Sequence, residues 1–197
     1  MQQDLTNWWR SPALGLAAAL MSVTCAVAQS TPLAERIAAC GACHGDDGNS
    51  RMENIPSLAG QPEFFLLNQL ILMREGVRRI EVMPPFVKDL TDADAEALAK
   101  HFSKLTPRAS PEPTDPTLVK RGAEIADQRL CRSCHLPTLA GQDQMPRLAK
   151  QRIDYLILTM KSYRDSPRPG ADTAMSAGVA GLSDTDIAAL AHYAASR

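Results

Sequence analysis

The sequence predicts an all-α protein built from two tandem helical domains that a proline-rich linker joins. Three observations lead to this expectation. The motif Cys-x-x-Cys-His occurs twice, at 40–44 and 131–135, and the segments around it repeat in the same order. Apolar residues recur at helical spacing in both halves, and no run has the alternation of a convincing strand. Four prolines lie between the halves and give this segment the composition of a semi-extended linker: Pro107, Pro111, Pro113 and Pro116.

Each motif has the pattern at which a c-type haem is attached. Two thiols must reach two vinyl groups on one edge of a flat porphyrin. On a helical turn, positions i, i+3 and i+4 share a face, so both cysteines and the histidine point together. We therefore expect two covalent haem c groups, with one histidine of each motif bound to iron. The residues expected to attach them are Cys40, Cys43, Cys131 and Cys134, with His44 and His135 as iron ligands.

Zinc binding and dithiol redox chemistry are the alternatives to haem. The Cys-x-x-Cys pairs of a zinc site usually lie about 15–20 residues apart, whereas Cys43 and Cys131 are 88 positions apart. A thioredoxin-like dithiol expects a βαβ setting, and no such pattern flanks either motif. Haem is therefore the favoured interpretation.

Residues 1–28 are expected to be a signal peptide. The run Leu14–Val27 is apolar, and Ala26-Val27-Ala28 is an A-x-A cleavage site, so the mature, periplasmic chain would begin near Gln29. An uncleaved membrane anchor is the first alternative, although the run is short for a span. The second is a lipoprotein acylated at Cys25, whose preceding residues match such processing poorly.

The bulk composition is that of a globular protein, with 45% hydrophobic and 22% charged residues. Domains are expected at 29–105 and 117–197, with the linker at 106–116. Each domain is small for an independent core, and an attached porphyrin would supply apolar surface. Residues 32–107 carry 11 acidic and 8 basic side chains, and 117–197 carry 8 and 11. This asymmetry could orient a protein partner or be ordinary solvated surface; no basic run resembles a nucleic-acid site.

The helices are expected in the same order in both halves. The first begins at Thr31-Pro32 in one half and at Asp115-Pro116 in the other, and runs to the cysteines. Each start is an N-cap residue followed by proline at the first helical position. After a polar loop, the second helix is expected at 63–75 in the first half and at 153–165 in the second.

Other segments repeat as well. Residues 55–61, Ile-Pro-Ser-Leu-Ala-Gly-Gln, align with 145–151, Met-Pro-Arg-Leu-Ala-Lys-Gln. The last helix of each half begins at a sequence that resembles a capping box, Thr91–Asp94 and Ser183–Asp186. Aligned apolar side chains are expected to build the two cores: Leu66, Leu67, Leu70 and Leu98 in the first half, and Leu156, Ile157, Met160 and Leu190 in the second.

The repeat narrows the choice of the sixth iron ligand. Met83 and Met175 coincide in the alignment, 39 and 40 residues after their histidines, in irregular loops before the last helix. Most other methionines align with apolar residues of the other half and are expected in the core. Met83 and Met175 are therefore the predicted ligands opposite His44 and His135.

Further residues are expected around each iron. Pro56 and Pro146 lie 12 and 11 residues after their histidines, and their carbonyls are expected to accept the second imidazole N–H. His101 and His192 do not align with each other, so they are expected on helix surfaces or between helices. Two arginines align and are expected either to pair with haem propionates or to lie on the surface: Arg78 and Arg168.

The sequence resembles the two-domain dihaem class I cytochromes c, and the cytochrome c4 family in particular. The resemblance covers essentially the whole mature chain and is carried by CGACHGDDGNS, PSLAGQPEFFLLNQL, the methionine loops, LTDADAEALAKHF and LSDTDIAALAHYA. It implies two class I cytochrome c domains that face each other about a pseudo-twofold, with haems close enough for internal electron transfer. It also implies the iron ligands His44 with Met83 and His135 with Met175.

The resemblance implies an electron carrier rather than an enzyme. Methionine ligation and burial would raise the potential of irons that cycle between ferric and ferrous. The implied partners are redox proteins, namely a membrane quinol–cytochrome c oxidoreductase and a terminal oxidase, and peripheral association with the membrane is compatible with this role. One alternative is the cytochrome subunit of a periplasmic dehydrogenase, such as a flavin-containing sulfide-oxidising enzyme. Another is a peroxidase or gas sensor with one open haem.

Overall fold

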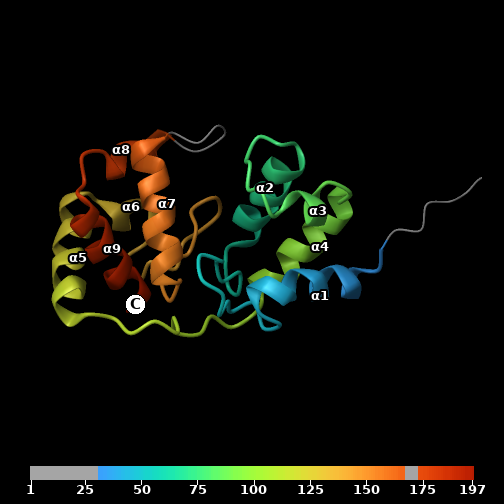
Figure 1. The fold of residues 1–197 in the computed structure, drawn as a ribbon, viewed down its shortest axis with the longest axis horizontal. Coiled ribbons are helices and arrows are strands. Elements are labelled where there is room, and N and C mark those ends of the chain that lie inside the picture. The colour runs from blue at the N-terminus through green and yellow to red at the C-terminus, as the bar shows by residue number, and fades with distance from the viewer. Residues whose placement is uncertain (1–30, 167–172) are drawn as a thin grey trace, which may run out of the picture. The chain divides into compact units, whose positions relative to one another are not determined.

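The computed structural model describes residues 31–166 and 173–197 (Figure 1). Within these ranges the chain is helical and forms no strand; one isolated antiparallel bridge joins Gln142 and Met145. The prediction of an all-α protein is confirmed. Among the described helices, none combines the length and the apolar character that a membrane span requires. The predicted signal peptide, 1–28, lies outside the described residues.

The first half of the structure consists of helices α1 to α4 and the second half of α5 to α9. The first-half helices are α1 (Leu33–His44), α2 (Glu63–Arg74), α3 (Pro84–Val87) and α4 (Asp92–Ser103). The second-half helices are α5 (Pro116–Gln128), α6 (Cys131–His135), α7 (Ile153–Asp165), α8 (Thr173–Val179) and α9 (Asp184–Ala195). The helices expected at 63–75 and 153–165 correspond to α2 and α7, with bounds that differ by at most one residue.

Three of the four helix starts predicted from the sequence have the expected side-chain cap. Thr91 and Ser183 form complete capping boxes with Asp94 and Asp186, as predicted. The Asp115 carboxylate accepts the N–H groups of residues 117 and 118 at the start of α5. The expected cap at Thr31 is wrong, because α1 begins at Leu33 after Pro32 and has no side-chain cap. Proline has no side-chain acceptor to cap this turn; the backbone carbonyl of Pro32 accepts the N–H groups of Glu35 at 3.0 Å and Arg36 at 3.2 Å.

Each half has its own apolar core. In the first half, α2 packs against α4, and the buried side chains include Leu66, Leu98 and Phe102. In the second half, α9 packs against both α5 and α7, and its core includes Leu156 and Leu190. The aligned leucines at these positions are therefore buried in both halves, which confirms the predicted core positions.

Helices α5 and α9 approach each other closely at Gly122. A Cβ atom added there would lie 2.1 Å from the carbonyl oxygen of Ala189 and 2.7 Å from the Cβ of Tyr193. Real atoms do not come that close, so the crossing requires glycine.

The predicted linker has no helix between residues 106 and 115, but it is packed, contrary to expectation. The Asn49 side chain binds it, donating to the Thr106 carbonyl at 3.1 Å and accepting the Arg108 N–H at 2.8 Å. Further on, the Glu112 carboxylate accepts the first two N–H groups of α7, from Ile153 at 2.8 Å and Asp154 at 3.0 Å. A carboxylate at a helix N-terminus is favourable for both hydrogen bonding and the helix dipole. The linker thus supplies the N-terminal cap that α7 lacks in its own sequence.

Candidate haem sites

The first Cys-x-x-Cys-His motif forms the last turn of α1. Cys40, Cys43 and His44 stand at i, i+3 and i+4 on this helix, as the spacing predicts. Both cysteines are half-buried free thiols, and burial raises the pKa of Cys40. His44 is buried, and its Nδ1 lies 2.8 Å from the carbonyl oxygen of Pro56.

The second motif forms a separate five-residue helix, α6, instead of ending the helix before it. Leu130 adopts a left-handed conformation with φ 55° and separates α6 from α5. Cys131 is half-buried and Cys134 exposed, and both are free thiols. His135 is buried, with Nδ1 2.9 Å from the carbonyl oxygen of Pro146.

The two histidines are prepared in the same way to bind a metal ion. A carbonyl can only accept, so Nδ1 donates in both hydrogen bonds and Nε2 is the nitrogen left for iron. Burial lowers the pKa of His44 and of His135, which favours the neutral imidazole that ligates metals. The predicted roles of the Pro56 and Pro146 carbonyls are confirmed.

Each predicted methionine packs against the same core as a cysteine of its own half. Met83 lies in the bend immediately before α3 and, like Cys40, is partly buried against the first-half core. Met175 is partly buried against the second-half core, as is Cys131. The expectation of irregular loops holds for Met83 but is wrong for Met175, which lies within α8.

The described residues do not support the alternative of a zinc site. Within residues 31–166 and 173–197, no group of three or more His, Cys, Asp and Glu side chains lies close enough to hold a metal ion. The four motif cysteines are not gathered, and none is in a disulfide. A four-thiolate zinc site is therefore not formed there, and the thiols are free to make thioether bonds.

The other two histidines and Arg78 contact protein groups in the structure. The His192 Nδ1 accepts the Asp115 N–H at 3.0 Å and so ties the start of α5 to α9. His101 is half-buried, with its ring edge-on to Phe102 at a centroid distance of 5.0 Å. Arg78 donates to the Gln69 side chain at 2.5 Å. Arg168 lies outside the described residues.

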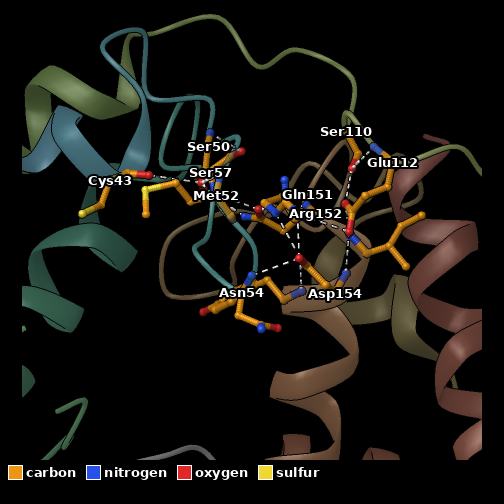
Figure 2. Close-up of polar contacts among 12 residues, drawn as sticks. Cys43, Ser50, Met52, Asn54, Ser57, Ser110, Glu112, Gln151, Arg152 and Asp154 are labelled. Carbon is orange, nitrogen blue, oxygen red and sulfur yellow. Dashed lines mark hydrogen bonds and ion pairs between the residues drawn. The ribbon is translucent and has the colours of Figure 1, made fainter. Parts of the chain in front are cut away.

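The residues that form the contact between the halves were not predicted from the sequence. The Gln61 side chain donates to the carbonyl of Arg147 and accepts its N–H, both at 2.9 Å. Gln151 does the same with Ser57, at 2.9 Å and 2.8 Å (Figure 2). Gln61 aligns with Gln151 and Ser57 with Arg147, so the two pairs are equivalent. This exchange has the form of a pseudo-twofold, which the family resemblance implied.

A charged cluster lies beside this contact. Asp154 accepts the N–H of Asn54 from the first half at 2.9 Å and pairs with Arg152 at 2.6 Å (Figure 2). Arg152 also lies 3.5 Å from Glu112 of the linker. The cluster therefore joins both halves and the linker. The repeated glutamine at positions 61 and 151 was the one signal in the sequence that could have indicated this contact.

Comparison with known proteins agrees with this geometry. Residues 31–101 match the family described as "Cytochrome C oxidase, cbb3-type, subunit III", and residues 119–196 match "Cytochrome c". The chain is 37% identical to cytochrome c4 of Stutzerimonas stutzeri, over 80% of this chain and 84% of that protein. It is 33% identical to the thiosulfate dehydrogenase electron acceptor of Thiomonas intermedia (strain K12), over 81% and 79%. The crystal structure of reduced recombinant cytochrome c4 from Pseudomonas stutzeri has a TM-score of 0.74 and 33% identity, covering 84% of this chain and 98% of that chain.

The chain therefore contains two tandem cytochrome c domains and carries two covalent haem c groups, one at each motif. The described residues fit this cofactor. In each half two free thiols and a neutral imidazole stand on one helical turn, and an apolar cluster lies beside them.

Proposed function

Because this chain belongs to the cytochrome c4 family of dihaem electron carriers, we propose that it moves single electrons in the periplasm from a membrane quinol–cytochrome c oxidoreductase to a terminal oxidase. It acts in this proposal as a carrier and not as an enzyme. Residues 1–28 are its cleaved signal peptide, and the mature chain begins at Gln29. N-terminal sequencing of the haem-loaded protein tests the cleavage: a start at Met1 contradicts it.

We assign the iron ligands by half. His44 and Met83 hold the first iron, and His135 and Met175 hold the second. Haem c supplies a one-electron couple at each site. The chain's own residues do the rest: the Pro56 and Pro146 carbonyls orient the imidazoles, and burial of both histidines limits the access of water. A thioether ligand and an apolar surrounding both disfavour the ferric charge, so both potentials are expected to be high.

One observation carries this proposal above all. The histidine-to-carbonyl hydrogen bond is present in both halves with nearly the same length, 2.8 and 2.9 Å. In both halves one methionine, at corresponding positions, also packs against the same core as a cysteine of the motif. Two irons with two protein ligands each have no open position for oxygen or peroxide. This arrangement supports electron transfer rather than catalysis or gas sensing.

A second candidate function differs only in the electron donor. The Thiomonas intermedia relative is named as the electron acceptor of a thiosulfate dehydrogenase. The present chain would then take electrons from a periplasmic dehydrogenase, either as a free acceptor or as its cytochrome subunit. Stable co-purification with a catalytic chain would favour the subunit role, and reduction by a quinol–cytochrome c oxidoreductase alone would favour the respiratory carrier.

The first experiment is an optical redox titration of the mature dihaem protein. A methionine-to-iron charge-transfer band from both haems, with two positive potentials, is the expected result. If one haem lacks this band, titrates far lower and binds carbon monoxide readily when reduced, its sixth ligand is not methionine. The carrier assignment would then give way to catalysis or sensing at that iron.

A further inference from the structure

Arg147 is a buried cation at the contact between the halves. Its side chain is only 5% exposed. The guanidinium donates to the carbonyl of Ala59 at 2.7 Å and to the carbonyl of Ala149. These two alanines occupy aligned positions in the repeat, so the charge lies between equivalent parts of the two halves. Its Nε is buried and has no hydrogen-bond partner among the described residues.

No carboxylate in the described part of the chain pairs with Arg147. Arg152 shows the contrast, because it is buried to the same extent but lies 2.6 Å from Asp154 and 3.5 Å from Glu112. Desolvation alone acts on Arg147 and lowers its pKa to about 10, so it stays charged at neutral pH. A buried charge without a counter-charge costs several kcal/mol. A partner of opposite charge is therefore missing from the protein atoms at this site.

The backbone fixes where this cation stands. Arg147 directly follows Pro146, whose carbonyl holds the imidazole of His135. Its own N–H and C=O are both held by Gln61. The backbone at Arg147 is thereby joined both to the segment that holds His135 and to the first half. Each haem c brings two propionate carboxylates, which are the acidic groups that the protein atoms do not supply.

We propose that Arg147 is a positioning residue whose counter-charge is haem propionate at the contact between the halves, and that it raises the reduction potential there. This inference rests on the proposed function. A fixed cation disfavours the ferric state, and in a contact that excludes water it is screened weakly. The aligned residue Ser57 is neutral, and its hydroxyl accepts the N–H of Ser50 at 3.0 Å. At this pair of equivalent positions there is therefore one cation and not two.

Arg147→Gln tests this in the complete dihaem protein. The reduction potential of at least one haem is expected to fall by about 59 mV, which corresponds to a tenfold change in the oxidised-to-reduced ratio of a one-electron couple. Arg121→Gln is the matched control: it removes the same charge from a side chain that is 53% exposed and paired with Asp186. Its effect on both potentials is expected to be smaller, because exposed charges are screened. Equal effects of the two variants would overturn the proposal.

Two further results separate charge from structure. Arg147→Lys keeps the charge and is expected to restore most of the potential; a fall as large as that of Arg147→Gln would overturn the proposal. If the glutamine variant does not accumulate, infrared difference spectra of protein with isotope-labelled arginine replace it. A guanidinium band that shifts on reduction in the natural sequence, and is lost in Arg147→Lys, is the expected result, and its absence contradicts the proposal. Failure of the proposed function has a different signature, namely a missing charge-transfer band in the unaltered protein.

Discussion

Gln61 reaches across to Arg147 and engages both its N–H and its C=O at 2.9 Å. Gln151 engages Ser57 in the same way from the other side. Four backbone groups that would otherwise be buried without partners are satisfied by two side chains. The contact between the halves thus depends on specific hydrogen bonds rather than on a continuous apolar core.

Gln61→Ala is expected to destabilise the protein, because it leaves the N–H and C=O of Arg147 buried without partners. Each unsatisfied group costs about 1–3 kcal/mol. Urea unfolding followed separately at each haem is expected to show two transitions that move apart, since the halves lose their coupling. Gln128→Ala, at an exposed position at the end of α5, is the control and is expected to change stability by less than about 0.5 kcal/mol. Equal effects would mean that the glutamine contact contributes nothing.

Gly122→Ala is expected to disrupt the crossing of α5 and α9. The new methyl group would meet the Ala189 carbonyl at 2.1 Å, so a helix must move, at a cost near the upper end of about 1–3 kcal/mol. Gly178→Ala is the matched control within α8, where no described atom lies within 4 Å of the added Cβ. It is expected to gain up to about 1 kcal/mol from helix propensity. Thermal unfolding of both variants checks the prediction, and a neutral Gly122→Ala would contradict the close crossing.

The capping box of α9 makes stability depend on pH. Hydrogen bonds from Ser183, and then Arg121, lower the pKa of Asp186 to about 2. Because the folded-state pKa lies below the unfolded value near 3.9, the carboxylate stabilises the fold above about pH 4 and loses this effect as the pH falls toward 2. Asp186→Asn is expected to be less stable than the natural sequence at pH 7 and to lose less on acidification. Asp143→Asn, in an exposed loop, is the control, and acid unfolding curves that coincide for all three proteins would contradict the prediction.

Ser183→Ala tests the second hydrogen bond of the same capping box, the one made by the serine side chain. The serine hydroxyl accepts the Asp186 N–H at 3.1 Å, and its loss is expected to cost about 1 kcal/mol. Thr91→Ala at the equivalent cap of α4 is expected to cost a similar amount. Denaturant unfolding measures both, and a clear difference between them would show that the two boxes are not equivalent in energy.

Met83→Ala and Met175→Ala are each expected to open one iron. Each variant should lose the charge-transfer contribution of one haem, lower that haem's potential and let its ferrous form bind carbon monoxide. Met52→Ala is the control, because Met52 is 49% exposed and is not a predicted ligand. A variant that keeps the full band would show that its methionine does not ligate iron.

Local features of the fold could be predicted from the sequence because they depend on neighbours in the chain. The spacing of Pro56 and Pro146 from their histidines indicated the carbonyl that orients each imidazole. The capping boxes at Thr91 and Ser183 were readable because cap and N3 residue are three positions apart. The aligned leucines of the second and last helices were found by helical periodicity. Each of these signals is contained in a short segment.

Contacts between distant segments could not be predicted in this way. Gln61 and Arg147 are 86 residues apart, and a polar side chain in an isolated segment has no reason to be buried. The same limit applied to Glu112, whose proline-rich surroundings indicated an extended linker but not the helix that it caps. The left-handed Leu130, which makes α6 a separate helix, had no signal either, because leucine rarely adopts that conformation.

The reciprocal glutamine contact has the geometry by which two identical chains pair about a twofold axis. In such a homodimer, whatever residue stands at one position of the contact must stand at both. An arginine at the position of Arg147 would then bury two guanidinium groups against each other, and like charges repel strongly where water is excluded. A single polypeptide lifts this constraint, since Ser57 and Arg147 can differ. Joining the halves covalently therefore permits an electrical asymmetry that a symmetric pair of one-haem proteins could not adopt.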